Sequence, residues 1–148
     1  MTKHSQIDIK IAESFAKQGL MGTLGARLLH AHEGEVTIEI LPNDSISQQH
    51  GFIHAGALAA IGDSACGYAA MSLSPPDKAV LTVEFKVSLM APAIGDRFQA
   101  RAQVIKPGRK LHFAQADIFA IEDAQERLIA RLSATITTVD QSRFPTTN

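Results

Sequence analysis

The sequence has 148 residues, of which 45% are hydrophobic and 20% charged, and its formal net charge at pH 7 is -1. A chain of this length is expected to form one domain, and its near-neutral charge argues against binding to nucleic acid or to an anionic membrane. The single cysteine, Cys66, cannot form an internal disulfide, no apolar stretch is long enough to cross a bilayer, and the polar amino terminus lacks the apolar run of a signal peptide. We therefore expect a cytoplasmic protein.

The first forty residues predict a helix followed by a β-hairpin. Apolar residues recur with helical spacing over residues 7–17, and Gly19 is expected to end that helix. Apolar and polar residues alternate over residues 35–41, which we expect to pair with a strand at residues 25–32. A polar loop then leads into a second helix.

Residues 54–71 predict a long helix with small or apolar residues on every side, which is typical of a buried helix. Its one acidic residue, Asp63, would lose hydration there, which is costly unless the carboxylate is paired, hydrogen-bonded or protonated. Either Asp63 is structural and is satisfied by local donors such as Ser64, or it is a catalytic acid or base. Ser64 itself is expected to bond a carbonyl one turn back.

Four strands are expected after this helix, in antiparallel succession, at residues 81–89, 97–105, 110–121 and 127–139. The first of them is expected to bury one face. The predicted fold class is therefore α+β, with an antiparallel sheet wrapped around a long central helix. We place the single domain at residues 1–140 and a flexible C-terminal tail at residues 141–148.

This element order resembles the hotdog fold. Gln48, the triplet His54-Ala55-Gly56 and Asp63 resemble the signature of the PaaI-like acyl-CoA thioesterases, whose triplet is usually His-Gly-Gly. The resemblance implies hydrolysis of a fatty-acyl or aryl-acyl thioester to the free acid and coenzyme A, with water as the only cosubstrate and no cofactor. It also implies a homodimer or a dimer of dimers.

Ala55 and Asp63 suit this chemistry. The first amides of a helix lack intrahelical partners and lie at the positive end of its dipole, so the Ala55 N–H can hold the carbonyl oxygen as it becomes negative. Asp63 would attack the carbonyl carbon or activate water. Eight residues of helix separate the two by about 12 Å along the axis. We therefore expect each active site to lie at a dimer interface, with Ala55 from one chain and Asp63 from the other.

Three further site residues follow from the resemblance. It implies that Gln48 positions the thioester or the water, that Gly56 lies against the substrate, and that Thr82 hydrogen-bonds the acid or the water. Thr82 is expected on the same strand face as Glu84 and Lys86, where an ordinary sheet threonine is an equally good interpretation.

The histidines do not predict a metal site. His50 and His54 are four residues apart, and His30 and His32 two apart, but no third ligand has a recognisable spacing. His54 either assists at the carbonyl and orients its loop, or is satisfied by the neighbouring backbone at the helix start.

A basic turn at residues 106–110 offers positive charge for the phosphates of coenzyme A, through Arg109 and Lys110 with Arg97 and Arg101 nearby. A solvated turn explains the same residues.

Three alternatives stay open. A hotdog dehydratase or hydratase would act on 3-hydroxyacyl or enoyl thioesters, and a non-catalytic module would only bind acyl-CoA. The run Gly62-Asp63-Ser64 also occurs in serine esterases, but there the serine stands on a turn rather than inside a helix. The length of the acyl pocket is expected to depend on Leu58, Ile61 and Tyr68.

Overall fold

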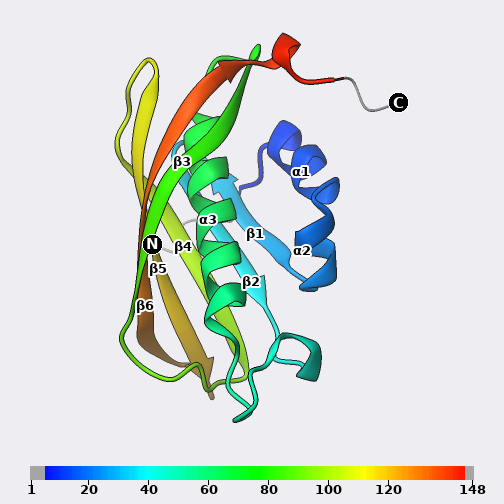
Figure 1. The fold of residues 1–148 in the computed structure, drawn as a ribbon, viewed down its shortest axis with the longest axis vertical. Coiled ribbons are helices and arrows are strands. Elements are labelled where there is room, and N and C mark those ends of the chain that lie inside the picture. Colours follow the sequence, from blue (N-terminus) through cyan, green and yellow to red (C-terminus); the bar gives the residue numbers. More distant parts are fainter. Residues whose placement is uncertain (1–5, 146–148) are drawn as a thin grey trace.

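One six-stranded antiparallel sheet curves around a long helix in the computed structural model, which describes residues 6–145 (Figure 1). The predicted α+β class, with a sheet wrapped around a central helix, is confirmed. The elements are α1 (Ile9–Ala16), α2 (Gly19–Thr23), β1 (Arg27–His32), β2 (Glu35–Ile40), the 3-10 turn η1 (Asp44–Ile46), α3 (Ala55–Ser72), β3 (Lys78–Leu89), β4 (Arg97–Lys106), β5 (Leu111–Glu122), β6 (Gln125–Asp140) and the 3-10 turn η2 (Gln141–Arg143).

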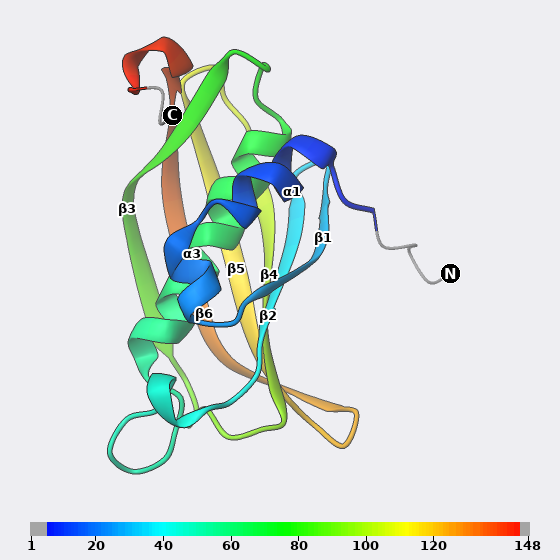
Figure 2. The same ribbon diagram turned by 90° about the vertical axis from the view of Figure 1, so that its right-hand side faces the viewer.

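Helix α3 lies in the concave face of the sheet, and α1 and α2 pack on the side of α3 that faces away from the sheet (Figures 1 and 2). Its small residues allow this close approach. A Cβ at Gly62 would lie only 3.2 Å from the Leu132 side chain and 3.3 Å from that of Ile118. The small, apolar composition of α3 is therefore explained by packing against β5 and β6.

The strand order is β1-β2-β4-β5-β6-β3, so β3 lies at the edge beside β6. Its residues Lys78 to Leu89 pair with β6, from Asp140 at one end to Ala130 at the other. The prediction of four strands in simple antiparallel succession was wrong, because the segment between β3 and β4 crosses the end of the sheet. Backbone N–H groups of Met90 and Ala91 bond the Ile129 carbonyl as that crossing begins.

Strand β3 does not bury one face, contrary to the prediction. Apolar side chains along it are exposed, at 47% for Leu81, 59% for Val83, 46% for Phe85 and 54% for Leu89. Within the described part of the chain, no strand pairs with the second edge of β3. The apolar alternation of β3 therefore has no covering partner in a single chain.

The amino-terminal region contains one helix more than predicted. Gly19 begins α2 instead of only ending the preceding helix. At the other end of the chain, η2 follows β6 directly, and the Gln141 N–H bonds the Asp77 carbonyl. The last three residues of the predicted tail lie outside the described residues. Among residues 6–145, no helix is long and apolar enough to cross a membrane.

Candidate functional site

The start of α3 leaves one backbone donor free. His54 is the N-cap residue, with φ -62° and ψ 137°, and its Nδ1 accepts the Gly56 N–H at 2.8 Å. That acceptor requires an imidazole unprotonated at Nδ1. A Cβ on Gly56 would lie 3.0 Å from the same nitrogen, so Gly56 leaves room for the cap. The Ala55 N–H has no acceptor among the described residues and is available to an external oxygen.

The preceding loop brings Gln48 to the same end of α3. The His54 N–H bonds the Ile46 carbonyl, which ties the loop to the helix start. The Gln48 side-chain oxygen accepts the His50 N–H. The N–H₂ group of the same side chain has no partner within the described part of the chain. One group at the start of α3 therefore contains Gln48, His54, Ala55 and Gly56. His54 caps the helix through the Gly56 N–H, which agrees with the interpretation that the neighbouring backbone satisfies this histidine.

Asp63 and Thr82 form a second group, two turns further along α3. The Thr82 hydroxyl donates to Asp63 Oδ1 at 2.6 Å. A β-bulge between Thr82 and Glu84 makes this contact possible. Thr82 stands opposite Ile136, whose side chain is buried in the core, whereas Glu84 stands opposite Thr135 on the outer face. The prediction that Thr82 shares a face with Glu84 was therefore wrong.

The structure does not bring the two groups together within one chain. Ala55 is the first residue of α3 and Asp63 the ninth, a separation of about 12 Å along the axis. A carboxylate beside a free helix-start amide would be suited to attack a polarised carbonyl, but one chain supplies these parts at different places.

Other candidate groups in α3 are accounted for by packing. Ser64 lies in mid-helix and donates to Gln18 Oε1 at 3.1 Å, so the predicted bond to a carbonyl one turn back was wrong. Cys66 is fully buried; burial, with the Asp63 charge adding to it, raises the pKa of its thiol to about 12. Within residues 6–145, no three histidine, cysteine or acidic side chains are grouped as metal ligands would be.

A cleft of about 420 Å³ adjoins Asp63 and runs along α3 between β3 and the segment that joins α1 to α2. Tyr68 lines this cleft, whereas Leu58 and Ile61 do not line it and are buried in the core. Gln18 also lines the cleft and was missed in the sequence. A polar residue next to a glycine in a short linker carries no sequence signal for a site.

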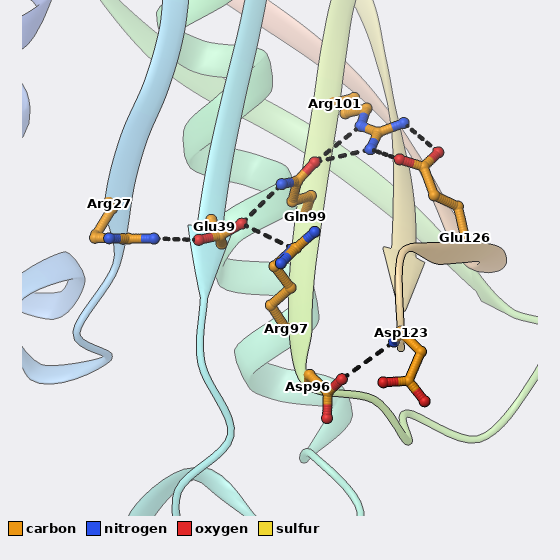
Figure 3. Close-up of polar contacts among 8 residues, drawn as sticks. All are labelled: Arg27, Glu39, Asp96, Arg97, Gln99, Arg101, Asp123 and Glu126. Carbon is orange, nitrogen blue, oxygen red and sulfur yellow. Dashed lines mark hydrogen bonds and ion pairs between the residues drawn. The ribbon is translucent and has the colours of Figure 1, made fainter. Parts of the chain in front are cut away.

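The outer face of the sheet carries a network of ion pairs that engages two of the candidate basic residues (Figure 3). Arg97 Nε lies 3.7 Å from a carboxylate oxygen of Glu39, and Arg101 forms a bidentate pair with Glu126. Glu39 is 3% exposed; burial opposes ionisation, but hydrogen bonds from Gln99 and Arg27 and the charges of Arg27 and Arg97 outweigh it and lower the Glu39 pKa. The side chains of Arg97 and Arg101 are therefore engaged in ion pairs on the sheet.

Arg109 and Lys110 lie in the β4–β5 turn and are exposed, with no carboxylate partner among the described residues. This turn is at the end of the sheet opposite the start of α3 (Figure 1). In a single chain, these two cations are therefore far from the Ala55 donor.

The family model described as Thioesterase superfamily matches residues 50–126, just over half of the chain. No curated protein matches significantly. A thioesterase family protein from Silicibacter pomeroyi has 48% sequence identity and a TM-score of 0.86, covering 88% of this chain and 96% of its own.

Two more distant structures share the fold. A variant of a thioesterase enzyme from Staphylococcus aureus has 25% identity and a TM-score of 0.75, covering 82% of this chain and 98% of its own. A variant of the phenylacetic acid degradation protein PaaI from Thermus thermophilus has 22% identity and a TM-score of 0.71, covering 81% and 98% respectively. The second of these shows similarity of fold alone.

Proposed function

The chain belongs to the thioesterase superfamily, and from that premise we propose that it hydrolyses acyl-coenzyme A thioesters to the free acid and coenzyme A. The acyl group would be fatty or aromatic, and the enzyme would act in the cytoplasm as a homodimer or a dimer of dimers. The observation that carries the proposal is the carboxylate of Asp63, held by Thr82 at the edge of a cleft.

The proposed chemistry uses the Ala55 N–H and the carboxylate of Asp63. The Ala55 N–H, at the positive end of α3, donates to the carbonyl oxygen as negative charge develops on it. Asp63 either attacks the carbonyl carbon or removes a proton from the attacking water, and Thr82 fixes the orientation of the carboxylate. If water attacks, the C–S bond breaks and the proton that Asp63 took passes to the sulfur, which leaves as the thiol of coenzyme A. If Asp63 attacks, breaking the C–S bond leaves a mixed anhydride on Asp63, and a water molecule then hydrolyses it to the free acid and supplies the proton that the thiolate takes up.

A dimer formed through β3 would complete the site. The open edge of β3 and its exposed apolar residues favour a second copy as its neighbour. Two-fold pairing of these edges would run the two α3 helices antiparallel, which places the Ala55 amide of one chain on the same side as Asp63 of the other. A dimer of dimers would further cover the outer face, where Ile105, Leu111 and Phe113 are exposed.

The same arrangement would give Arg109 and Lys110 a role. Their turn is at the end of the sheet opposite their own α3 start, so an antiparallel partner would bring its α3 start to that end. Two cations without carboxylate partners could then contact the phosphates of coenzyme A while the thioester reaches the Ala55 amide.

The test compares Asp63→Asn with the wild type on a panel of acyl-CoA thioesters, following thiol release. We expect kcat to fall at least about a hundredfold in a folded protein, because the amide retains the shape but is neither base nor nucleophile. Asp123→Asn is the matched control, since Asp123 lies in the β5–β6 turn with a φ of 47° that asparagine tolerates. Unchanged turnover by Asp63→Asn would make Asp63 structural.

The same panel separates the alternatives. It should include 3-hydroxyacyl and enoyl thioesters, whose dehydration or hydration without thiol release would indicate a dehydratase or hydratase. Tight binding of acyl-CoA without any turnover would indicate a binding module.

A further inference from the structure

The segment that crosses from β3 to β4, residues 90–96, lies at the same end of the sheet as the start of α3 (Figure 1). A hydrogen bond joins the two, in which the Ile53 N–H donates to the Ala93 carbonyl at 3.3 Å. Ile53 directly precedes the N-cap residue His54, and both Ile53 and Ala93 are buried. The position of the Ala93 carbonyl therefore helps to fix where α3 begins.

The two ends of this crossing segment are held by main-chain hydrogen bonds to the sheet. At its start, the Met90 N–H donates to the Ile129 carbonyl at 2.8 Å, and at its end the Asp96 N–H donates to the Ile121 carbonyl at 2.8 Å. Its middle, residues 92–94, forms no main-chain hydrogen bond to the sheet among the residues that the structure describes. The main chain of the sheet therefore does not fix this middle part.

The side chain of Arg127, near the start of β6, supplies the missing contact. Its Nη2 group donates to the Pro92 carbonyl at 3.3 Å and to the Ile94 carbonyl at 3.2 Å. These are the carbonyls on either side of Ala93, and the Ile94 N–H also donates to the Pro92 carbonyl at 3.0 Å, which closes a tight turn around Ala93. One guanidinium group therefore holds both flanks of the residue whose carbonyl bonds Ile53.

Arg127 differs in its partners from other arginines of the sheet. Arg97 and Arg101 pair with carboxylates in the network of Figure 3. Arg131, four residues further along β6, donates to both carboxylate oxygens of Asp117, at 2.6 and 3.0 Å. Arg127 forms no ion pair with any described residue, although the adjoining β5–β6 turn is acidic. Its hydrogen-bond donors are therefore directed at main-chain carbonyls instead of a carboxylate.

We propose that Arg127 is a positioning residue for thioester hydrolysis, which acts through Ala93 and Ile53 on the start of α3. The group that it positions is the Ala55 N–H, and the inference rests on the proposed thioesterase function. A donor to the developing oxyanion has to lie within about 3 Å of it, and a displacement of about 1 Å can cost about a hundredfold in rate. Without the hydrogen bonds of Arg127, the middle of the crossing segment and the loop bonded to it can shift, while the groups that bind the rest of the substrate stay in place.

The test compares Arg127→Met with the wild type on acyl-CoA thioesters, following thiol release. We expect kcat to fall about tenfold and KM to change by less than about twofold, because methionine retains an apolar stem but donates no hydrogen bond. Hydrogen exchange of the Ile53 N–H should become at least about fivefold faster, since that group loses a fixed acceptor. Arg131→Met, at an exposed arginine of the same strand, is the matched control and should change neither measurement. Both arginines are exposed, so both variants should fold, which thermal unfolding checks.

Three results would overturn the inference: a kcat of Arg127→Met within about twofold of the wild type, a fall in kcat without faster exchange at Ile53, or an equal loss of activity in Arg131→Met. The exchange measurement needs no substrate, so it separates this inference from the proposed function. If the wild type releases no thiol from any acyl-CoA but Arg127→Met exchanges faster at Ile53, the proposed function fails and the coupling of Arg127 to the helix start stands. If the wild type hydrolyses thioesters and Arg127→Met behaves as the wild type does, only this inference fails.

Discussion

A site shared between two chains can be tested by mixing inactive variants. The donor must lie about 3 Å from the carbonyl oxygen and the acid about 3 Å from the carbon, so with a C=O bond of about 1.2 Å they are at most about 7 Å apart. Within one α3, Ala55 and Asp63 are about 12 Å apart along the axis. The difference exceeds what one aspartate side chain bridges while it is bonded to Thr82.

The two lesions are Ala55→Pro and Asp63→Asn. Proline removes the Ala55 N–H, which has no acceptor among residues 6–145, and the extended backbone of His54 suits a residue before proline. Co-refolding equal amounts makes half of the dimers mixed, and each mixed dimer has one intact site and one doubly altered site. We expect a quarter of wild-type activity in the thiol-release assay.

A second mixture gives the opposite check. The double variant of Ala55→Pro with Asp63→Asn, refolded with an equal amount of wild type, should retain a quarter of the activity if sites are shared, because mixed dimers then have no intact site. Sites contained in single chains would retain half. The reasoning is refuted if mixed dimers are isolated through two different tags and the first mixture stays as inactive as its parents.

Three further predictions concern substrate binding and stability. Arg109→Ala should raise KM for acyl-CoA about tenfold and leave KM for the matching acyl-pantetheine unchanged, because only the first substrate carries the nucleotide phosphates; equal effects would contradict the role. Burial lowers the pKa of His112, so the unfolded chain binds more protons and stability should fall as the pH drops below about 6.5. Urea unfolding at pH 7.5 and 5.5 should show a smaller fall for His112→Gln, and equal falls would exclude this histidine as a cause. Gly62→Val should lower the free energy of unfolding by about 2 kcal/mol and Tm by about 6 °C, because the valine side chain would collide with Leu132 and Ile118. An unchanged Tm would show that the sheet moves to make room for the valine.

The parts of the fold that sequence could predict are those set by local pattern. Helix α3 follows from its small and apolar residues, and Asp63 stands out because it is the one acid among them. The signal for the helix start is also local, since His54 and Gly56 are two residues apart and cap the helix together. These features depend on neighbours in the chain and not on the path of the sheet.

Strand β3 shows why the remainder could not be predicted. Alternation of apolar residues indicates a strand but does not identify its neighbour, and pairing with β6 depends on the crossing after Leu89. The bulge between Thr82 and Glu84 changes which residues face α3, and a single extra residue leaves no mark in the pattern. Alternation also cannot distinguish a face that the same chain covers from an exposed one, as Phe85 illustrates.

The position of Gln18 in the wall of the cleft could not be predicted for another reason. Its bonds reach Tyr68 and Ser64, about fifty residues later, and no periodicity links positions so distant. Polar residues in linkers are usually solvated, so only the three-dimensional packing of α1 and α2 beside α3 reveals these hydrogen bonds of Gln18.

The position of β3 also determines the order in which the protein can be completed during synthesis. After β1, each of the strands β2, β4, β5 and β6 pairs with a neighbour already made, so this part of the sheet can grow as the chain emerges. Strand β3 is made before β4 but has only β6 to pair with, so it must wait unpaired until the last strand appears. Thr82 therefore reaches Asp63 late, and a nascent chain that ends before β6 would contain the carboxylate but not its assembled surroundings. In the dimer that we propose, such a chain would also lack an ordered β3 edge to pair with a second copy, so dimerisation would follow the completion of both chains.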